Sequence, residues 1–292
     1  MRQPLVLIAL PGMDFDPTEV AISWQTLQRR GVEVVFASPD GQRATPDALM
    51  LDGEGLDVWG AIPLLKKIKL LGLLLRANGD ARAACAAMQA QAAFRHPLAY
   101  ADLKVSAFDG LILPGGHRAR GIRPYLENPP LQRFVGDFFD SGKPVGAICH
   151  GVVLAARSTS RLTGKSSLYG RKSTALGWEM EHKAWLLMRL AGRFWDAAYY
   201  RTYLEQAGEP AGHRSVQAEA TRALASPADF IDVAGDAPHF LRKSGGLLRD
   251  SADDSRPAWV VTDGNYVSAR WPGDAHAFAA AFAALLTPAR QV

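Results

Sequence analysis

The sequence predicts an α/β fold built on a mainly parallel sheet, and three observations support this prediction. First, an apolar run at residues 5–10 ends in Pro-Gly, as expected for a buried strand. Second, a helical pattern at 20–30 stops at Gly31 and is followed by a β-branched run at 32–37. Strand, helix and strand within about 35 residues indicate a parallel βαβ unit. Third, the same alternation returns at 108–148.

Each later element is read from apolar periodicity and turn residues. An acidic residue and Pro17 precede the first helix and suit its first turn. A strand pair with an Asp-Gly-Asn turn is predicted at 258–270. The remaining predictions are strands at 108–113 and 144–148, a strand pair at 167–176, and helices at 131–140, 150–157 and 274–286.

Two segments interrupt this alternation. Residues from about 42 to 107 predict a helical cap insertion, with one Leu/Lys helix near 61–76 and one Ala-rich helix near 79–94. Residues from about 183 to 257 are rich in Trp, Tyr, Arg and Asp and form an extra segment without a clear pattern. Because no repeat or low-complexity linker is visible, we expect residues 1–292 to form a single domain.

Composition and charge narrow the class of protein. Of 292 residues, 48% are hydrophobic and 21% charged, as in an average folded chain. The 33 basic and 29 acidic residues are dispersed, which argues against nucleic acid as a partner. The most apolar window, 62–75, is shorter than the roughly 20 residues of a membrane span and contains lysines, so no membrane partner is expected.

Two cysteines in a chain of this size indicate a reducing compartment, and we expect a cytoplasmic location. The first apolar run has no small-residue cleavage pattern after it and is interpreted as a strand, not a signal peptide. Cys85 lies in the Ala-rich pattern and is interpreted as a small core residue. Only His96 lies in the insertion, with Glu54 far away, so no metal ligand set is apparent.

Cys149 is the main candidate for chemistry. It follows the predicted strand at 144–148 and precedes a helix, and ligands of open parallel sheets bind at such strand ends. The turn would project the sulfur into a cleft, and the helix dipole would favour the thiolate. Gly146 and Gly151 leave room for a tight corner. The alternative is a buried structural cysteine.

Residues beside Cys149 and after the strand at 108–113 could assist it. His150 is either a general base or a residue that caps the helix start. Gly115 and Gly116, with the backbone N–H of His150, are candidate oxyanion donors, because glycines allow N–H groups to point into a cleft. The alternative for the two glycines is an ordinary turn.

In combination these residues resemble the ThiJ/PfpI superfamily, relatives of the class I glutamine amidotransferases. The resemblance covers residues 5–38, 108–176 and 260–286. Among its longer members, the branch with glyoxalase III and holding chaperones is most similar, through Phe15-Asp16-Pro17-Thr18-Glu19, Ser38-Pro39-Asp40-Gly41 and Pro114-Gly115-Gly116-His117. The resemblance implies a flavodoxin-like, doubly wound parallel sheet with a helical insertion and an extended C-terminal elaboration.

The resemblance also implies roles for four residues. Cys149 would be the nucleophile, His150 its base partner, and Glu19 a carboxyl in contact with the sulfur. An acidic residue about thirty positions after the cysteine would orient the histidine, and we expect this to be Glu181, with Glu179 and His182 as alternatives. The chain departs from the family pattern at Val152, where proline is common, and in the length of 183–257.

The function implied is a cysteine-dependent conversion of small reactive carbonyl compounds, similar to the glutathione-independent glyoxalase III that turns methylglyoxal into lactate. Addition of a thiolate and proton transfer require no cofactor, so none is expected. The expected assembly is a homodimer. Two alternatives are a stress-related holding chaperone, whose apolar surface at 62–75 binds unfolding proteins, and a peptidase- or amidase-like hydrolase of the same superfamily.

Overall fold

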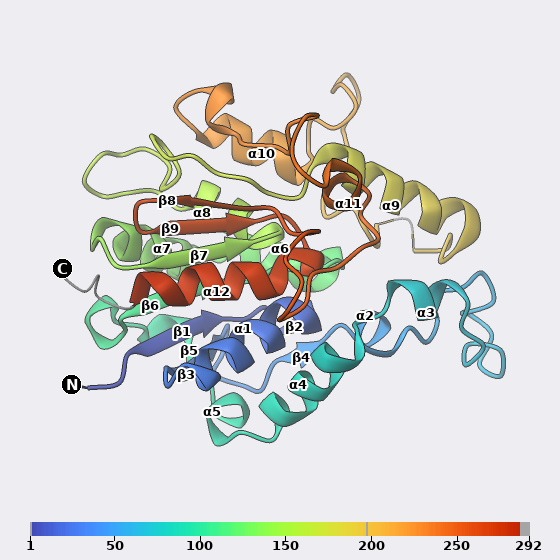
Figure 1. Cartoon of the computed structure of the whole chain (residues 1–292), viewed down its shortest axis with the longest axis horizontal. Coiled ribbons are helices and arrows are strands. Elements are labelled where there is room, and N and C mark those ends of the chain that lie inside the picture. Colours follow the sequence, from blue (N-terminus) through green and yellow to red (C-terminus); the bar gives the residue numbers. More distant parts are fainter. Residues whose placement is uncertain (1, 197, 287–292) are drawn as a thin grey trace.

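A seven-stranded sheet lies at the centre of the protein (Figure 1). The structure, a computed structural model, describes residues 2–196 and 198–286. The strand order is β5-β3-β1-β6-β7-β9-β8; all neighbours are parallel except β8 and β9. The predicted doubly wound α/β fold is confirmed. The strands are β1 (Leu5–Ala9), β3 (Glu33–Ser38), β5 (Leu98–Ala99), β6 (Gly110–Leu113), β7 (Val145–Ile148), β8 (Val260–Asp263) and β9 (Tyr266–Ala269), and β2 (Met13–Phe15) pairs separately with β4 (Thr45–Pro46).

The central strands β1, β6 and β7 are short, apolar and almost wholly buried, as expected when helices cover both faces of a parallel sheet. Their register pairs Leu7 with Leu111 and Leu111 with Val145. The strands are therefore aligned, and their carboxyl ends meet at one edge of the sheet. The chain changes direction across the sheet between β1 and β6, which is where open α/β sheets bind ligands.

Helices cover the two faces of the sheet. On one face α1 (Pro17–Arg29) packs between α4 (Gly79–Gln89) and α12 (Ala275–Leu286). On the other, α8 (His150–Arg157) packs on β6 and β7 and contacts α6 (Ala119–Leu126), α7 (Pro129–Asp140) and α10 (Val216–Ala223). The predicted helices around 20–30, 131–140, 150–157 and 274–286 are confirmed, as is the strand pair at the C-terminal end.

Two predicted elements are wrong. Of the helix expected at 61–76, only α3 (Leu71–Leu75) is helical, and 59–67 forms turns. Gly60 and Pro63 interrupt the helical pattern, and the leucines around them have no core to pack on. No strand pair forms at 167–176, where the backbone makes one isolated bridge from Ser173 to Phe230. The other helices are α2 (Ala48–Asp52), α5 (Ala92–Arg95), α9 (Trp178–Ala191), α11 (Phe240–Ser244) and the short 3-10 helices Tyr100–Asp102, Val105–Ala107, Pro227–Asp229 and Pro272–Asp274.

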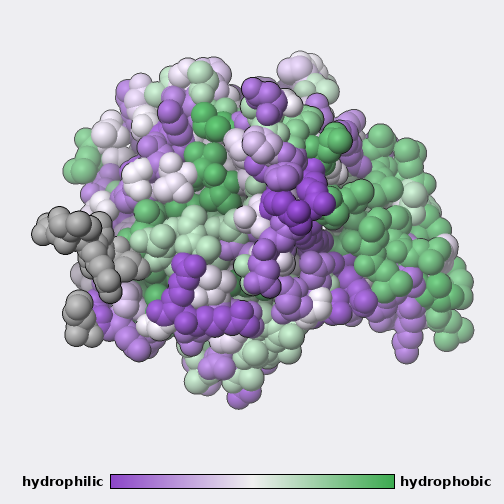
Figure 2. All heavy atoms as spheres, in the orientation of Figure 1, coloured by the Kyte–Doolittle hydropathy of each residue, from purple (hydrophilic) through white to green (hydrophobic). Residues whose placement is uncertain are grey.

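The segment expected as a helical cap has two parts. Helices α4 and α5 pack on α1 and β3, and β5 forms an edge of the main sheet. The part around α3 projects from one end of the molecule (Figure 1), and Figure 2 shows an apolar surface there. We call this surface the apolar end. Its exposed side chains are Ile62, Leu64, Leu65, Ile68, Leu70, Leu73 and Leu74.

Among the described residues, no helix combines the length and apolar character needed to cross a bilayer.

Candidate active site

Cys149 lies at the turn from β7 into α8, as the sequence predicted. Its backbone has φ 56° and ψ −124°, a conformation that residues other than glycine rarely adopt. The turn is compact: a Cβ atom at Gly151 would lie 1.9 Å from the carbonyl oxygen of Leu113. Only glycine therefore fits there, and the first turn of α8 sits directly on the end of β6. This strained corner is the local geometry of a nucleophile elbow.

Glu19 lies in the first turn of α1 and is fully buried. Asp16 caps this helix by accepting hydrogen bonds from the N–H groups of Thr18 (2.8 Å) and Glu19 (3.0 Å). One oxygen of Glu19, Oε2, accepts a hydrogen bond of 2.7 Å from the N–H of Gly115. The other, Oε1, has no nitrogen or oxygen partner among the described residues, and the Cys149 thiol interacts with this carboxyl.

Burial and the neighbouring Asp16 raise the pKa of Glu19 well above its ordinary value. The carboxyl therefore holds its proton at pH values where an exposed glutamate is ionised. A carboxyl with a raised pKa beside a thiol can both accept and return a proton during a reaction.

The surroundings of Cys149 favour the neutral thiol, whereas the helix dipole led us to expect a thiolate. Burial raises the pKa of the thiol well above its ordinary value, and the negative charges of Glu19 and Asp16 act in the same direction. The N–H of His150 donates to the sulfur and opposes this shift, but it does not outweigh burial. Cys149 exposes 0% of its surface to solvent. The desolvation of the sulfur therefore exceeds the influence of the helix dipole on which the expectation depended.

The His150 ring bridges Cys149 and Thr202. Its Nδ1 lies 3.4 Å from Cys149 Sγ, and its Nε2 lies 2.7 Å from Thr202 Oγ1. Burial lowers the pKa of His150 to about 3, so the ring is neutral. In the tautomer with the proton on Nε2, that nitrogen donates to Thr202 and Nδ1 is free to accept the thiol proton. The geometry therefore places a proton acceptor beside the thiol, while burial makes this imidazole a weak base.

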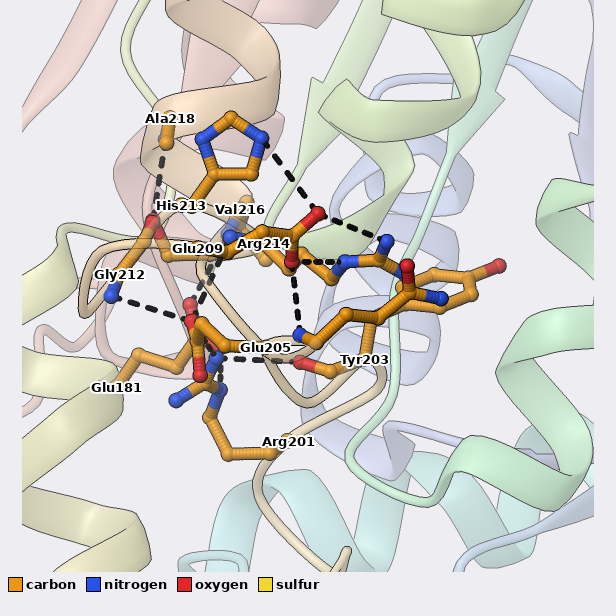
Figure 3. A network of polar contacts seen from close by, with 12 residues as sticks. Glu181, Arg201, Tyr203, Glu205, Glu209, Gly212, His213, Arg214, Val216 and Ala218 are labelled. Carbon is orange, nitrogen blue, oxygen red and sulfur yellow. Dashed lines mark hydrogen bonds and ion pairs between the residues drawn. The ribbon is translucent and has the colours of Figure 1, made fainter.

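Glu181 occupies a different position from the one expected. It is buried beside His150, but its Oε1 lies 3.0 Å from Arg201 Nε and its Oε2 accepts a hydrogen bond of 3.0 Å from the N–H of Val216 (Figure 3). Burial raises the pKa of Glu181 to about 7. The outward nitrogen of His150 is held by Thr202, so Thr202 makes the direct contact expected of Glu181.

Arg201 and Tyr203 hold the backbone on either side of Thr202. Arg201 is fully buried, with its guanidinium 4.8 Å from the ring centre of Trp178, and its Nη2 donates to Glu205 Oε1 at 2.6 Å (Figure 3). The Tyr203 ring lies between the guanidinium groups of Arg123 and Arg157, at 5.0 and 4.7 Å. The long segment 183–257 therefore delivers the Thr202 side chain to His150.

The oxyanion donors are also arranged differently from the expectation. The N–H of Gly115 is bound to Glu19, and the N–H of His150 donates to the Cys149 sulfur. A Cβ atom at Gly115 would lie 2.7 Å from the backbone nitrogen of His150, and one at Gly116 would lie 2.3 Å from Asp14 O. Gly115 thus allows the turn after β6 to approach the start of α8, and Gly116 allows it to approach Asp14. The N–H of Gly115 is used to bind Glu19.

A cavity of about 350 Å³ reaches Cys149. Seven of its eighteen lining residues are leucine or methionine, and its polar groups include His117 and Tyr200, whose ring centres are 5.0 Å apart. Burial lowers the pKa of His117 to about 3, so this ring is neutral as well. The lining residues are Met50, Leu74, Leu75, His117, Cys149, Leu176, Met180, Glu181, Lys183, Ala184, Leu187, Tyr200, Gly245, Gly246, Leu247, Arg249, Trp271 and Pro272.

The second cysteine has no such surroundings. Cys85 is buried in α4, and burial raises the pKa of its thiol to about 11, as expected for a core residue. Within residues 2–196 and 198–286, no three His, Cys, Asp or Glu side chains are grouped so that they could hold a metal ion.

Curated relatives match a short part of the chain. A segment of 75 residues, 26% of this chain and 38% of the relative, is 42% identical to protein/nucleic acid deglycase 2 of Escherichia coli. A match of 81 residues, 28% of this chain and 42% of the relative, is 37% identical to an uncharacterized protein of Archaeoglobus fulgidus. The chain thus matches less than half the length of these relatives.

Solved structures match over nearly the whole chain at low identity. The glyoxalase III of Candida albicans superposes with a TM-score of 0.57 and 16% identity, covering 97% of both chains. The Rapid Encystment Protein 24 KDa of Francisella tularensis gives 0.58 and 14% identity, covering 98% of this chain and 100% of that one. These likenesses support the fold. The profile of the family described as ThiJ/PfpI family-like matches residues 10–211, and the chain belongs to this family.

Proposed function

We propose that this protein is a cysteine-dependent enzyme that converts small reactive carbonyl compounds, in the manner of a glutathione-independent glyoxalase III. The observation that carries the proposal is the grouping of a buried carboxyl, a thiol and a neutral imidazole at one strained corner. Glu19 and His150 both interact with the Cys149 sulfur, and Cys149 lines the cavity.

The first step is addition of the thiol to an aldehyde. As Cys149 Sγ forms a bond to the aldehyde carbon of methylglyoxal, the thiol proton passes to His150 Nδ1 and then to the former carbonyl oxygen, giving a hemithioacetal. No resting thiolate is required, because the base lies 3.4 Å from the sulfur. The neutral thiol is thus compatible with nucleophilic chemistry.

The second step is an isomerisation that needs a carboxyl. In the fraction of molecules in which Glu19 is ionised, it removes the proton from the carbon attached to sulfur, while the hydroxyl proton of that carbon passes through His150 to the adjacent ketone oxygen, giving an enediolate. Return of the proton to the neighbouring carbon yields a thioester, which water hydrolyses to lactate and the free thiol. The raised pKa of Glu19 suits a group that alternately accepts and donates a proton.

Amide hydrolysis fits this site less well. A peptidase- or amidase-like reaction forms a tetrahedral oxyanion that needs preorganised N–H donors. Here the N–H of Gly115 is occupied by Glu19 and that of His150 is directed at the sulfur. A carbonyl addition, in which the oxygen is protonated directly, makes less demand on such donors.

Methylglyoxal consumption and lactate formation by wild type and by Cys149→Ala test the proposal. We expect turnover in the wild type, loss of at least about a hundredfold in Cys149→Ala, and full activity in Cys85→Ala, the control for removing a buried thiol. Equal activity in the wild type and Cys149→Ala would contradict the proposal.

The apolar end favours a second candidate, a holding chaperone. Leu64 is 88% exposed and Leu70 66% exposed, which is unusual for neighbouring leucines on a free surface. Suppression of the aggregation of a heated client protein would test it. We expect Leu64→Glu with Leu70→Glu to abolish suppression and Cys149→Ala to retain it; the reverse pattern would exclude this candidate.

We also propose a homodimer that works in the cytoplasm. Both cysteines are free, which suits a reducing compartment. Light scattering of the purified protein measures the assembly directly, and a monomeric mass at micromolar concentration would contradict the dimer.

A further inference from the structure

One arginine lines the cavity that reaches Cys149. Arg249 follows α11 in the extra segment, is half-buried, and shares the cavity wall with Trp271, His117 and Tyr200. Nothing in the carbonyl chemistry of the proposed function uses a cation at this position. Its presence therefore needs a separate explanation.

Internal contacts use only a small part of the Arg249 guanidinium. Its Nη2 donates to the backbone oxygen of Leu75 at 2.7 Å, and the group lies 5.7 Å from the ring centre of Trp271. Throughout residues 2–196 and 198–286, no carboxylate oxygen lies within 4.0 Å of it. A guanidinium has five N–H donors, so most of the hydrogen-bonding capacity and the whole charge remain available.

The other charged side chains of the cavity have partners. Lys183 is exposed and pairs with Glu179 at 3.1 Å, and Glu181 pairs with Arg201 at 3.0 Å. Arg249 is also close enough to influence nearby groups. Burial raises the pKa of Asp16 and the charge of Arg249 opposes this rise, whereas burial lowers the pKa of His117 and Arg249 adds to that shift. Among the described residues, Arg249 is therefore the charged side chain of this cavity wall that has no ion-pair partner within 4.0 Å.

We propose that Arg249 is an anion-binding subsite and that Cys149 acts preferentially on carbonyl compounds that carry a carboxylate, with neutral compounds such as methylglyoxal as weaker substrates. A guanidinium matches the two oxygens of a carboxylate and binds it more strongly where the surroundings are apolar. The leucines, methionines and Trp271 of the cavity supply such surroundings. This inference rests on the proposed function and narrows its substrate class.

Alkylation of Cys149 by iodoacetate and iodoacetamide tests the subsite without turnover. Both reagents form the same S–C bond and release iodide, but only iodoacetate carries a carboxylate. The ratio of the two rates, measured by mass spectrometry on the peptide containing Cys149, reports the preference of the cavity for an anion. Because iodoacetamide is uncharged, its rate in each variant shows whether the protein is folded and whether a reagent can reach Cys149.

We expect Arg249→Met to lower the iodoacetate-to-iodoacetamide ratio by about threefold to tenfold, and salt to lower the wild-type ratio. Arg249→Lys, which keeps the charge but loses the two-point match, should give a ratio between those of Arg249→Met and wild type. Lys183→Gln, which removes a paired exposed charge, should stay near the wild-type ratio. If iodoacetamide modifies Cys149 and Arg249→Met leaves the ratio unchanged, this inference is overturned while the proposed function stands. If neither reagent modifies Cys149 in the native protein, both are overturned.

Discussion

His150 Nε2 and Thr202 Oγ1 lie 2.7 Å apart, although 52 positions separate the two residues in the chain. The threonine hydroxyl contacts ring nitrogen Nε2, while the other ring nitrogen, Nδ1, contacts the Cys149 sulfur. The pair therefore fixes the rotation of the ring, and it can accommodate the tautomer with the proton on Nε2, in which Nδ1 can accept the thiol proton.

Replacing Thr202 should slow the reaction. In Thr202→Val the shape is kept but the hydroxyl is lost, so the ring nitrogen Nε2 is left without its partner in a buried site. We expect kcat for methylglyoxal to fall by about tenfold or more. Thr202→Ser keeps the oxygen and should retain most of the activity. Equal kcat values for Thr202→Val and Thr202→Ser would show that the hydroxyl does not orient the ring.

The elbow could be predicted from sequence because it is local. Gly146, Cys149 and Gly151 follow one another at a strand end, and apolar runs define that strand. Thr202 and Arg249 carried no such signal, because each reaches the site through packing of a segment without clear periodicity. The protonation state of Cys149 was also beyond the sequence, since the helix dipole is visible in a motif whereas the depth of burial is not.

The alkylation rate of Cys149 should rise steeply with pH and show no plateau below about pH 9, the ordinary range of a thiol. Burial and the charge of Glu19 raise the pKa of this thiol, so the thiolate is scarce near neutral pH. Iodoacetamide labelling of the native protein, followed on the Cys149 peptide, measures this. A plateau between about pH 6 and pH 8 would instead indicate the thiolate that the sequence suggested.

Glu19→Gln should separate stability from activity. The pKa of Glu19 is raised in the folded state, so the folded protein binds a proton that the unfolded chain releases above about pH 4.5. This group therefore lowers the free energy of unfolding as pH rises from that value toward its folded pKa. The glutamine cannot ionise and can still accept the hydrogen bond from Gly115. We expect the variant to gain stability over wild type as pH rises, at up to about 1.4 kcal/mol per pH unit.

The same variant should be almost inactive, because the isomerisation needs a carboxyl that exchanges protons. Urea unfolding between about pH 5 and pH 8 gives the stability difference, and lactate formation gives the activity. A stability difference between wild type and Glu19→Gln that stays constant with pH would mean that Glu19 is ionised in the folded protein.

Arg201→Met should destabilise the protein and disturb the site. Arg201 is fully buried against Glu181, and removing it leaves a carboxyl in an apolar environment without its counter-ion. Removing one partner of a buried ion pair lowers the free energy of unfolding by about 3–5 kcal/mol. Because Glu181 would then bind a proton more readily, the loss should be smaller at low pH. Adding Glu181→Gln should restore part of the stability, since no charge then remains buried. Urea unfolding of the three variants, Arg201→Met, Glu181→Gln and the double variant, gives the coupling energy. A double variant whose loss equals the sum of the two single losses would show that the two side chains do not stabilise each other.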